Sequence, residues 1–87
     1  MLEKEIRKKI IEIMELTLEI NTREKNTVFI TFHGHCNVFD VKIYNKGWGN
    51  RIEANFFKDI YFDTLPQEEA ELYLDEIIEK LEELKIN

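Results

Sequence analysis

The pentapeptide FHGHC, residues 32–36, holds both histidines and the only cysteine of the chain. Cys and His are the ligands that zinc prefers, and a structural zinc site takes about four of them. A Cys beside a His can also serve as an activated nucleophile. His33 and Cys36 are therefore the candidate metal ligands, and also the candidate centre of a metal-assisted or Cys-dependent hydrolase.

The rest of the chain offers little to complete either site. His35 falls in the turn and points elsewhere, and there is no second cluster of metal-ligating residues. A nucleophile also needs a pocket and an oxyanion hole, and 87 residues provide little concavity. We therefore interpret FHGHC as a hairpin turn that uses the backbone freedom of Gly34, and we expect a non-enzymatic protein without a cofactor.

The loop YNKGWGNR, residues 44–51, is the second candidate site. Trp48 is the only tryptophan, lies between two glycines, and has Lys46 and Arg51 nearby. Exposed Trp and Arg anchor protein interfaces, and an aromatic ring beside Arg can also hold a nucleobase or a phosphate. The commoner arrangement is that Trp48 folds back to cap the end of a small core.

A helix is predicted over residues 2–20, with two apolar stripes at helical spacing. The first stripe contains Leu2, Ile6, Ile10, Ile13, Thr17 and Ile20. The second stripe contains Ile11, Met14 and Leu18. One stripe is enough to pack against a sheet, so the second meets either the other helix or a second subunit.

Two alternating segments, residues 27–33 and 36–44, predict antiparallel strands. A two-residue type II′ turn at Gly34 and His35 would pair Ile30 with Phe39, which puts both apolar sets on one side. His33 and Cys36 would then be cross-strand neighbours on the other side. A polar loop over residues 45–55 leads to a third strand over residues 56–62.

A second helix is predicted over residues 64–86, where Thr64 and Gln67 fit a capping box. The element order is α-β-β-β-α in a single domain, residues 1–87. We expect an α+β fold, a three-stranded antiparallel sheet with both helices packed on one face.

The other face of the sheet is predicted to be too aromatic for an ordinary solvent-facing surface. It would carry Phe29, Thr31, His33, Val38, Tyr44, Phe57 and Tyr61. We expect it to bind a partner, most simply a second copy of the chain. The candidate ligand- or partner-binding residues are Trp48, Arg51, Tyr44, His33, Phe29 and Tyr61.

The net charge of −6 comes from the C-terminal segment, residues 63–87, which carries nine acidic and two basic side chains. Glu76, Glu79 and Glu83 form an acidic helix face. Such a face commonly serves solubility, and its functional alternative is imitation of a phosphate backbone to inhibit a host nuclease. Because no basic footprint exists, we expect no direct nucleic-acid binding.

The sequence also bears on location. No apolar run approaches the ~20 residues that cross a membrane, and the N-terminus lacks a signal-peptide core. The single Cys36 cannot form an intramolecular disulfide. We therefore expect no membrane association and a cytoplasmic location.

The element order resembles that of double-stranded-RNA-binding domains. That family places lysines at the start of its second helix, where this chain has QEEAE at residues 67–71. The difference removes the phosphate-binding surface, so RNA binding by that mode is not expected.

A second resemblance spans residues 28–84. The pairs Gly34–His35, Ile43–Tyr44, Gly47–Trp48 and Ile60–Tyr61, followed by a Glu-rich helix, are similar to small phage and prophage proteins of Gram-positive bacteria. The resemblance implies a phage setting, in which small acidic non-enzymes inhibit host defence by blocking a nuclease or holding a signalling nucleotide. We therefore expect a homo-oligomeric binding protein of a bacterial host cell, with a host protein or a signalling nucleotide as its partner.

Overall fold

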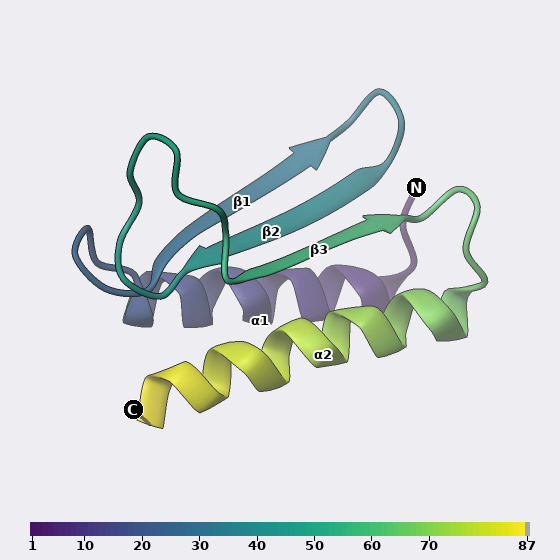
Figure 1. The fold of residues 1–87 in the computed structure, drawn as a ribbon. Helices are drawn as coiled ribbons and strands as arrows, with labels where there is room; N and C mark the ends of the chain where they lie inside the picture. Colours follow the sequence, from purple (N-terminus) through teal and green to yellow (C-terminus); the bar gives the residue numbers. More distant parts are fainter. Residues whose placement is uncertain (87) are drawn as a thin grey trace.

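The computed structural model describes residues 1–86 and has the predicted element order. The elements are α1 (Lys4–Ile20), β1 (Thr27–His33), β2 (Val38–Tyr44), β3 (Phe56–Tyr61) and α2 (Gln67–Ile86). Figure 1 shows both helices running along one side of the sheet, while the other side is left uncovered. The α+β fold class is therefore confirmed.

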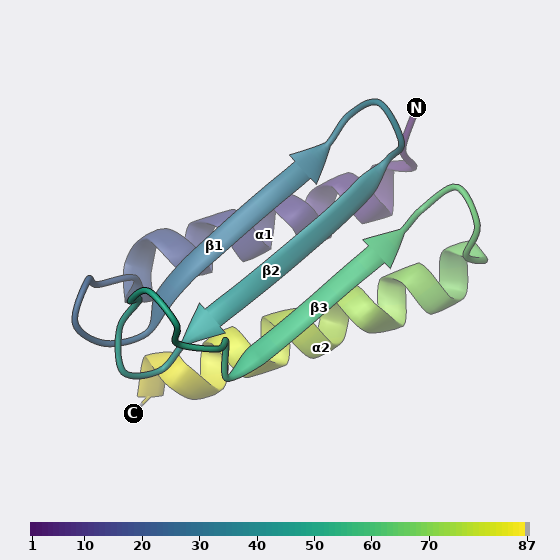
Figure 2. The ribbon, with the colours of Figure 1, turned by 45° about the horizontal axis from the view of Figure 1, so that its top comes forward.

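The sheet is antiparallel with strand order β1-β2-β3, so β2 is central and the other two strands are edges (Figure 2). Side chains alternate between the two faces. Those that point toward the helices from β2 and β3 include Phe39, Val41, Ile43 and Ile60, each at most 1% exposed.

Both helices bury a stripe in one core with the inner sheet face. On α1 the buried residues are Ile6, Ile13, Leu16 and Thr17. On α2 they are Ala70, Leu74, Ile77, Ile78 and Leu81. Each fully buried Leu or Ile side chain contributes about 1.5–3 kcal/mol to the free energy of unfolding, so this core is the main source of stability.

The helices also meet along one flank through ion pairs. Lys9 Nζ lies 2.6 Å from Asp75 Oδ1, and Lys85 Nζ lies 2.8 Å from Glu19 Oε2. These pairs place α2 beside one flank of α1 and leave the opposite flank without a helical neighbour.

The predicted strand register is wrong by two residues. Ile30 pairs with Val41, not with Phe39, and the turn has four residues, 34–37, instead of two. Gly34 does not have a positive φ, whereas Asn37 does, at 52°, so the type II′ turn is also wrong. Asn tolerates this left-handed backbone, and a hydrogen bond from the Cys36 N–H to the His33 oxygen (3.2 Å) closes the turn.

The helix starts also differ from the prediction. The second helix begins at Gln67 and not at residue 64, because the Thr64 hydroxyl donates to the Tyr61 oxygen (3.3 Å) instead of capping the helix. The Pro66 oxygen accepts the bond from the Ala70 N–H at the helix start. The first helix begins at Lys4, two residues later than predicted.

The loop between β2 and β3, residues 45–55, stands on the uncovered side of the sheet (Figure 1). Its Gly47 has a φ of 89°, and a Cβ there would lie 2.6 Å from the Arg23 oxygen. The Asn26 N–H also bonds to the Asn45 oxygen (3.2 Å). This loop is therefore held against residues 21–26, at the start of β1. Among residues 1–86 no helix has the length and apolar character needed to span a membrane.

Candidate functional site

The uncovered sheet face, here called the open face, is built from the alternate residues of all three strands. The register arranges them in rows across β1, β2 and β3. The rows are Thr27–Tyr44, then Phe29–Lys42–Phe57, then Thr31–Asp40–Asp59, then His33–Val38–Tyr61. All seven residues predicted for this face lie on it, because a register shift of two residues does not change which way a side chain points.

One end of the open face carries an aromatic cluster. The centre of the Phe29 ring lies 5.6 Å from the centre of the Tyr44 ring, in an edge-to-face arrangement, and 6.2 Å from the centre of the Trp48 ring. Trp48 is 54% exposed and Phe29 is 43% exposed, whereas Tyr44 is buried beneath them. The interpretation that Trp48 caps the core is therefore wrong, because its ring lies over the open face.

Arg51 does not join this cluster. It is exposed, lies further along the loop in a turn with a φ of 72°, and takes part in none of the ring contacts found among residues 1–86. The cationic group beside an open-face ring is instead Lys42, whose Nζ lies 5.5 Å from the centre of the Phe57 ring. Strand alternation puts both side chains on the open face, and the attraction between the cation and the ring favours their contact.

The middle of the open face carries two carboxylates. Asp40 on β2 and Asp59 on β3 are direct cross-strand partners. His33 Nε2 lies 2.9 Å from Asp40 Oδ2. The negative charge of Asp59, together with its hydrogen bond to the phenol, raises the pKa of Tyr61. A nearby carboxylate disfavours the phenolate form, which explains the direction of the shift.

No Lys or Arg of the described chain forms an ion pair with these carboxylates. The ion pairs that lysines form within residues 1–86 join Lys8 to Glu5, Lys9 to Asp75, Lys58 to Glu76 and Lys85 to Glu19, and His33 is a hydrogen-bond partner of Asp40. Like charges placed directly opposite on neighbouring strands are destabilising. Asp40 and Asp59 therefore form an acidic pair that a cation from outside would stabilise.

His33 and Cys36 are not brought together as predicted. The cross-strand neighbour of His33 is Val38, and Cys36 lies exposed in the turn. Its sulfur lies 3.9 Å from the backbone oxygen of His33, while the imidazole is bonded to Asp40. Within residues 1–86 no three His, Cys, Asp or Glu side chains gather as metal ligands would.

The acidic helix face is partly neutralised within the molecule. Lys58 points to the inner face of the sheet, and its Nζ reaches Glu76 Oε2 at 2.7 Å and lies 4.7 Å from the Tyr73 ring centre. Of the three predicted residues, Glu79 and Glu83 remain exposed, and neither forms an ion pair within residues 1–86.

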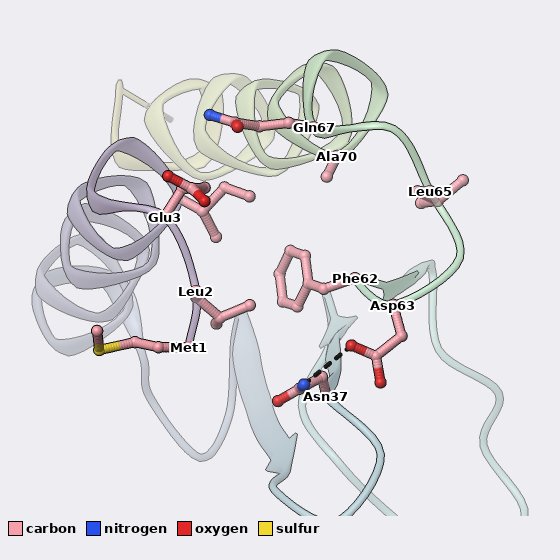
Figure 3. A pocket seen from close by; sticks show the side chains of 10 residues that line it. Met1, Leu2, Glu3, Asn37, Phe62, Asp63, Leu65, Gln67 and Ala70 are labelled. Carbon is pink, nitrogen blue, oxygen red and sulfur yellow. Dashed lines mark hydrogen bonds between the residues drawn. The ribbon is translucent and has the colours of Figure 1, made fainter.

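Hollows of the surface lie away from the open face. Figure 3 shows one at the end of the helices, lined by Leu2, Phe62 and Ala70, with a hydrogen bond from Asn37 Nδ2 to Asp63 Oδ1 (3.0 Å) at its edge. Its volume is about 240 Å³, less than the roughly 300–1,000 Å³ of a small-molecule site. Another lies between α1 and Phe32 at the β1 edge. Neither hollow is lined by a residue of the open face.

The sequence places Phe57 on this face but does not single out Lys42, Asp40 or Asp59 as candidate site residues. Period-two alternation assigns Asp59 to the same face as Tyr61, and this signal was available. The pairing of Asp59 with Asp40 required the register between β2 and β3, which no short turn fixes.

Comparison of the chain with protein-family models, with curated proteins and with solved structures found no match.

Proposed function

We propose that this chain is a small, non-enzymatic binding protein whose open face docks a partner protein. The observation that carries the proposal is the acidic pair, Asp40 and Asp59, which has no Lys or Arg partner among residues 1–86. Exposed rings surround it on both sides, from Phe29 and Trp48 at one end to Tyr61 at the other. Exposed Trp and Tyr rings are typical anchor residues of protein interfaces.

The chemistry of the face defines the partner. An Arg side chain offers paired N–H donors that match a carboxylate, so one Arg of the partner would relieve the repulsion between Asp40 and Asp59. Apolar side chains on either side of that Arg would cover Phe57 and Tyr61, the exposed rings on either side of Asp59 along β3. The partner is therefore a protein segment with a basic residue between apolar ones. The uncovered face of a three-stranded sheet offers such a segment a broad contact area.

The resemblance of the sequence to small phage proteins supports inhibition of a host protein as the role of this docking. The partner would be a protein of a bacterial host's defence system, bound and inhibited in the cytoplasm. Inhibition through nucleic-acid mimicry by α2 is less favoured, because Glu76 is already paired with Lys58. The two modes predict different dependence on particular carboxylates.

A random-peptide selection tests the docking mode. The wild-type chain should enrich peptides with Arg or Lys beside apolar residues. The variant Asp40→Asn/Asp59→Asn should bind those peptides at least about tenfold more weakly, because each charged hydrogen bond contributes about 1.5–3 kcal/mol. The control Glu79→Gln/Glu83→Gln removes the same charge from α2 and should bind as the wild type does.

Three results would contradict the proposal. They are equal binding by the Asp40→Asn/Asp59→Asn variant, loss of binding only in the α2 control, and no enrichment of any peptide. The second of these results would support mimicry of nucleic acid by α2 instead.

A signalling nucleotide is the second candidate ligand, favoured by the exposed Trp48 ring next to Phe29 and by the exposed Lys46 two residues away. A base could stack on such a ring while a cation contacts the phosphate. Titration of Trp48 fluorescence with a panel of cyclic and linear nucleotides checks this candidate. A change in emission that is absent with nucleosides would support it, and a flat response to every nucleotide would rule it out.

A further inference from the structure

The two edges of the sheet differ in how well they are protected against pairing with another chain. The β3 edge, FFKDIY, contains Lys58 and Asp59, and the inward-pointing Lys58 is a common device against edge pairing. The β1 edge, TVFITFH, has seven residues and contains no Lys, Arg, Asp, Glu or Pro. An unprotected apolar edge of this length is a template for a further strand.

The backbone of β1 has two residues with groups available at this edge. In an antiparallel ladder successive residues point their N–H and C=O groups alternately to the two sides. The Val28 N–H donates to Asn21 Oδ1 (2.8 Å), which lies outside the sheet. The backbone N–H and C=O groups of Val28, Ile30 and Phe32 therefore point to the free edge of β1. Because the Val28 N–H is already bonded to Asn21, the backbone groups of Ile30 and Phe32 are the ones that remain available to a new strand.

Two copies of β1 can use these groups on each other. If a two-fold axis passes beside Thr31, Ile30 of one copy lies opposite Phe32 of the other copy. The symmetry makes the same pair a second time, with the two copies exchanged. Both pairs are then of the hydrogen-bonded type, which exchange two N–H···O bonds each. The register that satisfies the free groups is therefore self-complementary.

The flank of α1 opposite α2 presents an apolar stripe beside the same edge. Its members, here called the outer stripe, are Ile11 (59% exposed), Met14 (43%) and Leu18 (74%). Ile11 also lines the hollow between α1 and Phe32, so the outer stripe adjoins β1. Figures 1 and 2 both show α1 running alongside β1 in the opposite direction.

The charges of α1 match an antiparallel copy of the same helix. Residues 4–9 carry four basic side chains and one acidic, whereas residues 12–19 carry three acidic and no basic side chains. If Ile11 packs against the partner's Met14, then Lys8 comes close to the partner's Glu15. A parallel copy would instead place like charges together.

One axis satisfies the strand and the helix together. A strand rises about 3.3 Å per residue and a helix about 1.5 Å. We use these two rises to find the residue of α1 that lies beside Thr31. Taking the Asn21–Val28 bond as the reference contact gives about residue 14, and taking the hollow between Ile10, Ile11 and Phe32 gives about residue 12. The midpoint between Ile11 and Met14 lies between these values. The two self-complementary surfaces therefore share one two-fold axis.

We propose that two copies of this chain pair through their β1 edges and the outer stripes of α1, forming one continuous six-stranded sheet. The dimer has a consequence for the open face. Pairing at Thr31 puts Phe29 of one copy opposite the partner's His33, so that the aromatic cluster of each copy adjoins the acidic pair of the other. Two joined faces thus form one binding surface.

Sedimentation equilibrium of the whole chain tests the dimer without any ligand, so its outcome is independent of the proposed function. We expect a mass twice the 10.5 kDa of the chain. Leu18→Lys should raise the dissociation constant about a hundredfold, because two Leu side chains lose their burial in each dimer. The matched control is Leu72→Lys on α2, where Leu72 is 61% exposed, and it should leave the dimer unchanged. A monomeric wild type, or a Leu18→Lys variant that associates normally, would overturn the proposal.

A charge exchange tests the antiparallel arrangement of the two α1 helices. Lys8→Glu and Glu15→Lys should each weaken the dimer, by about tenfold, since each places two repulsive pairs at the interface. The double variant Lys8→Glu/Glu15→Lys restores opposite charges and should associate as the wild type does. If the double variant is as weak as the single ones, the arrangement is wrong.

Discussion

At the scale of single residues, the acidic pair of the open face is the feature that the fold does not require. Asp40 and Asp59 lie directly opposite each other, and their local partners are His33 and Tyr61. Two carboxylates in this arrangement lower the free energy of unfolding. Positions that cost stability in this way are expected at functional sites.

Removing one charge of the pair should therefore stabilise the chain. We expect Asp59→Asn to raise the free energy of unfolding by about 0.2–1 kcal/mol, as the repulsion with Asp40 disappears. Urea unfolding at neutral pH measures this change. Glu79→Gln, the control on the exposed face of α2, should change stability by less, and a destabilised Asp59→Asn variant would show that the pair is structural.

The same variant changes the titration of Tyr61. The charge and hydrogen bond of Asp59 raise the pKa of this phenol, so Asp59→Asn should lower it toward its ordinary value of about 10. Tyr61 thus adds stability that is fully present below about pH 10 and is lost as pH rises through its raised pKa. Nuclear magnetic resonance of the tyrosine rings follows the titration. An unmoved Tyr61 pKa in Asp59→Asn would show that another group causes the shift.

At the scale of elements, the helices, strands and faces could be predicted from apolar periodicity, but the register could not. Pairing Ile30 with Phe39 or with Val41 leaves every side chain on the same face, because the two registers differ by two residues. Both registers place the apolar side chains of the two strands on one face, so apolar periodicity does not distinguish between them. The difference lies in a left-handed Asn37 and in the bonds that hold the turn.

Trp48 shows a similar limit. Its place over Phe29 depends on how loop 45–55 docks on residues 21–26, which involves contacts between distant segments. Local sequence patterns carry no signal for such a contact. The glycine beside Trp48, in contrast, has a conformation that only its own residue type adopts easily.

Gly47 should therefore be the sensitive glycine of this chain and Gly34 the tolerant one. A Cβ on Gly47 would lie 2.6 Å from the Arg23 oxygen at a φ of 89°, whereas a Cβ on Gly34 meets nothing closer than 3.9 Å. We expect Gly47→Ala to lower the free energy of unfolding by about 1–3 kcal/mol and Gly34→Ala to change it little. Urea unfolding of both variants measures the difference. Equal effects would show that the two loops are not held together as described.

At the scale of the whole molecule, each surface has a separate proposed use. The inner sheet face and both helices form the core. The β1 edge and the outer stripe of α1 fit a second copy, and the open face remains available to a different protein. The dimer and the docking face are compatible, because the two-fold axis leaves the open faces side by side.

The central claim is that the open face is the docking surface, and a nuclear magnetic resonance titration tests it most directly. The probe is an Arg-containing peptide recovered by the selection, added to the isotope-labelled full chain. We predict that the shifted signals are the amides of Asp40 and Asp59 and the indole N–H of Trp48, with the α2 amides of Glu79 and Glu83 unmoved. Shifts confined to α2, or spread over residues remote from the open face, would contradict the account.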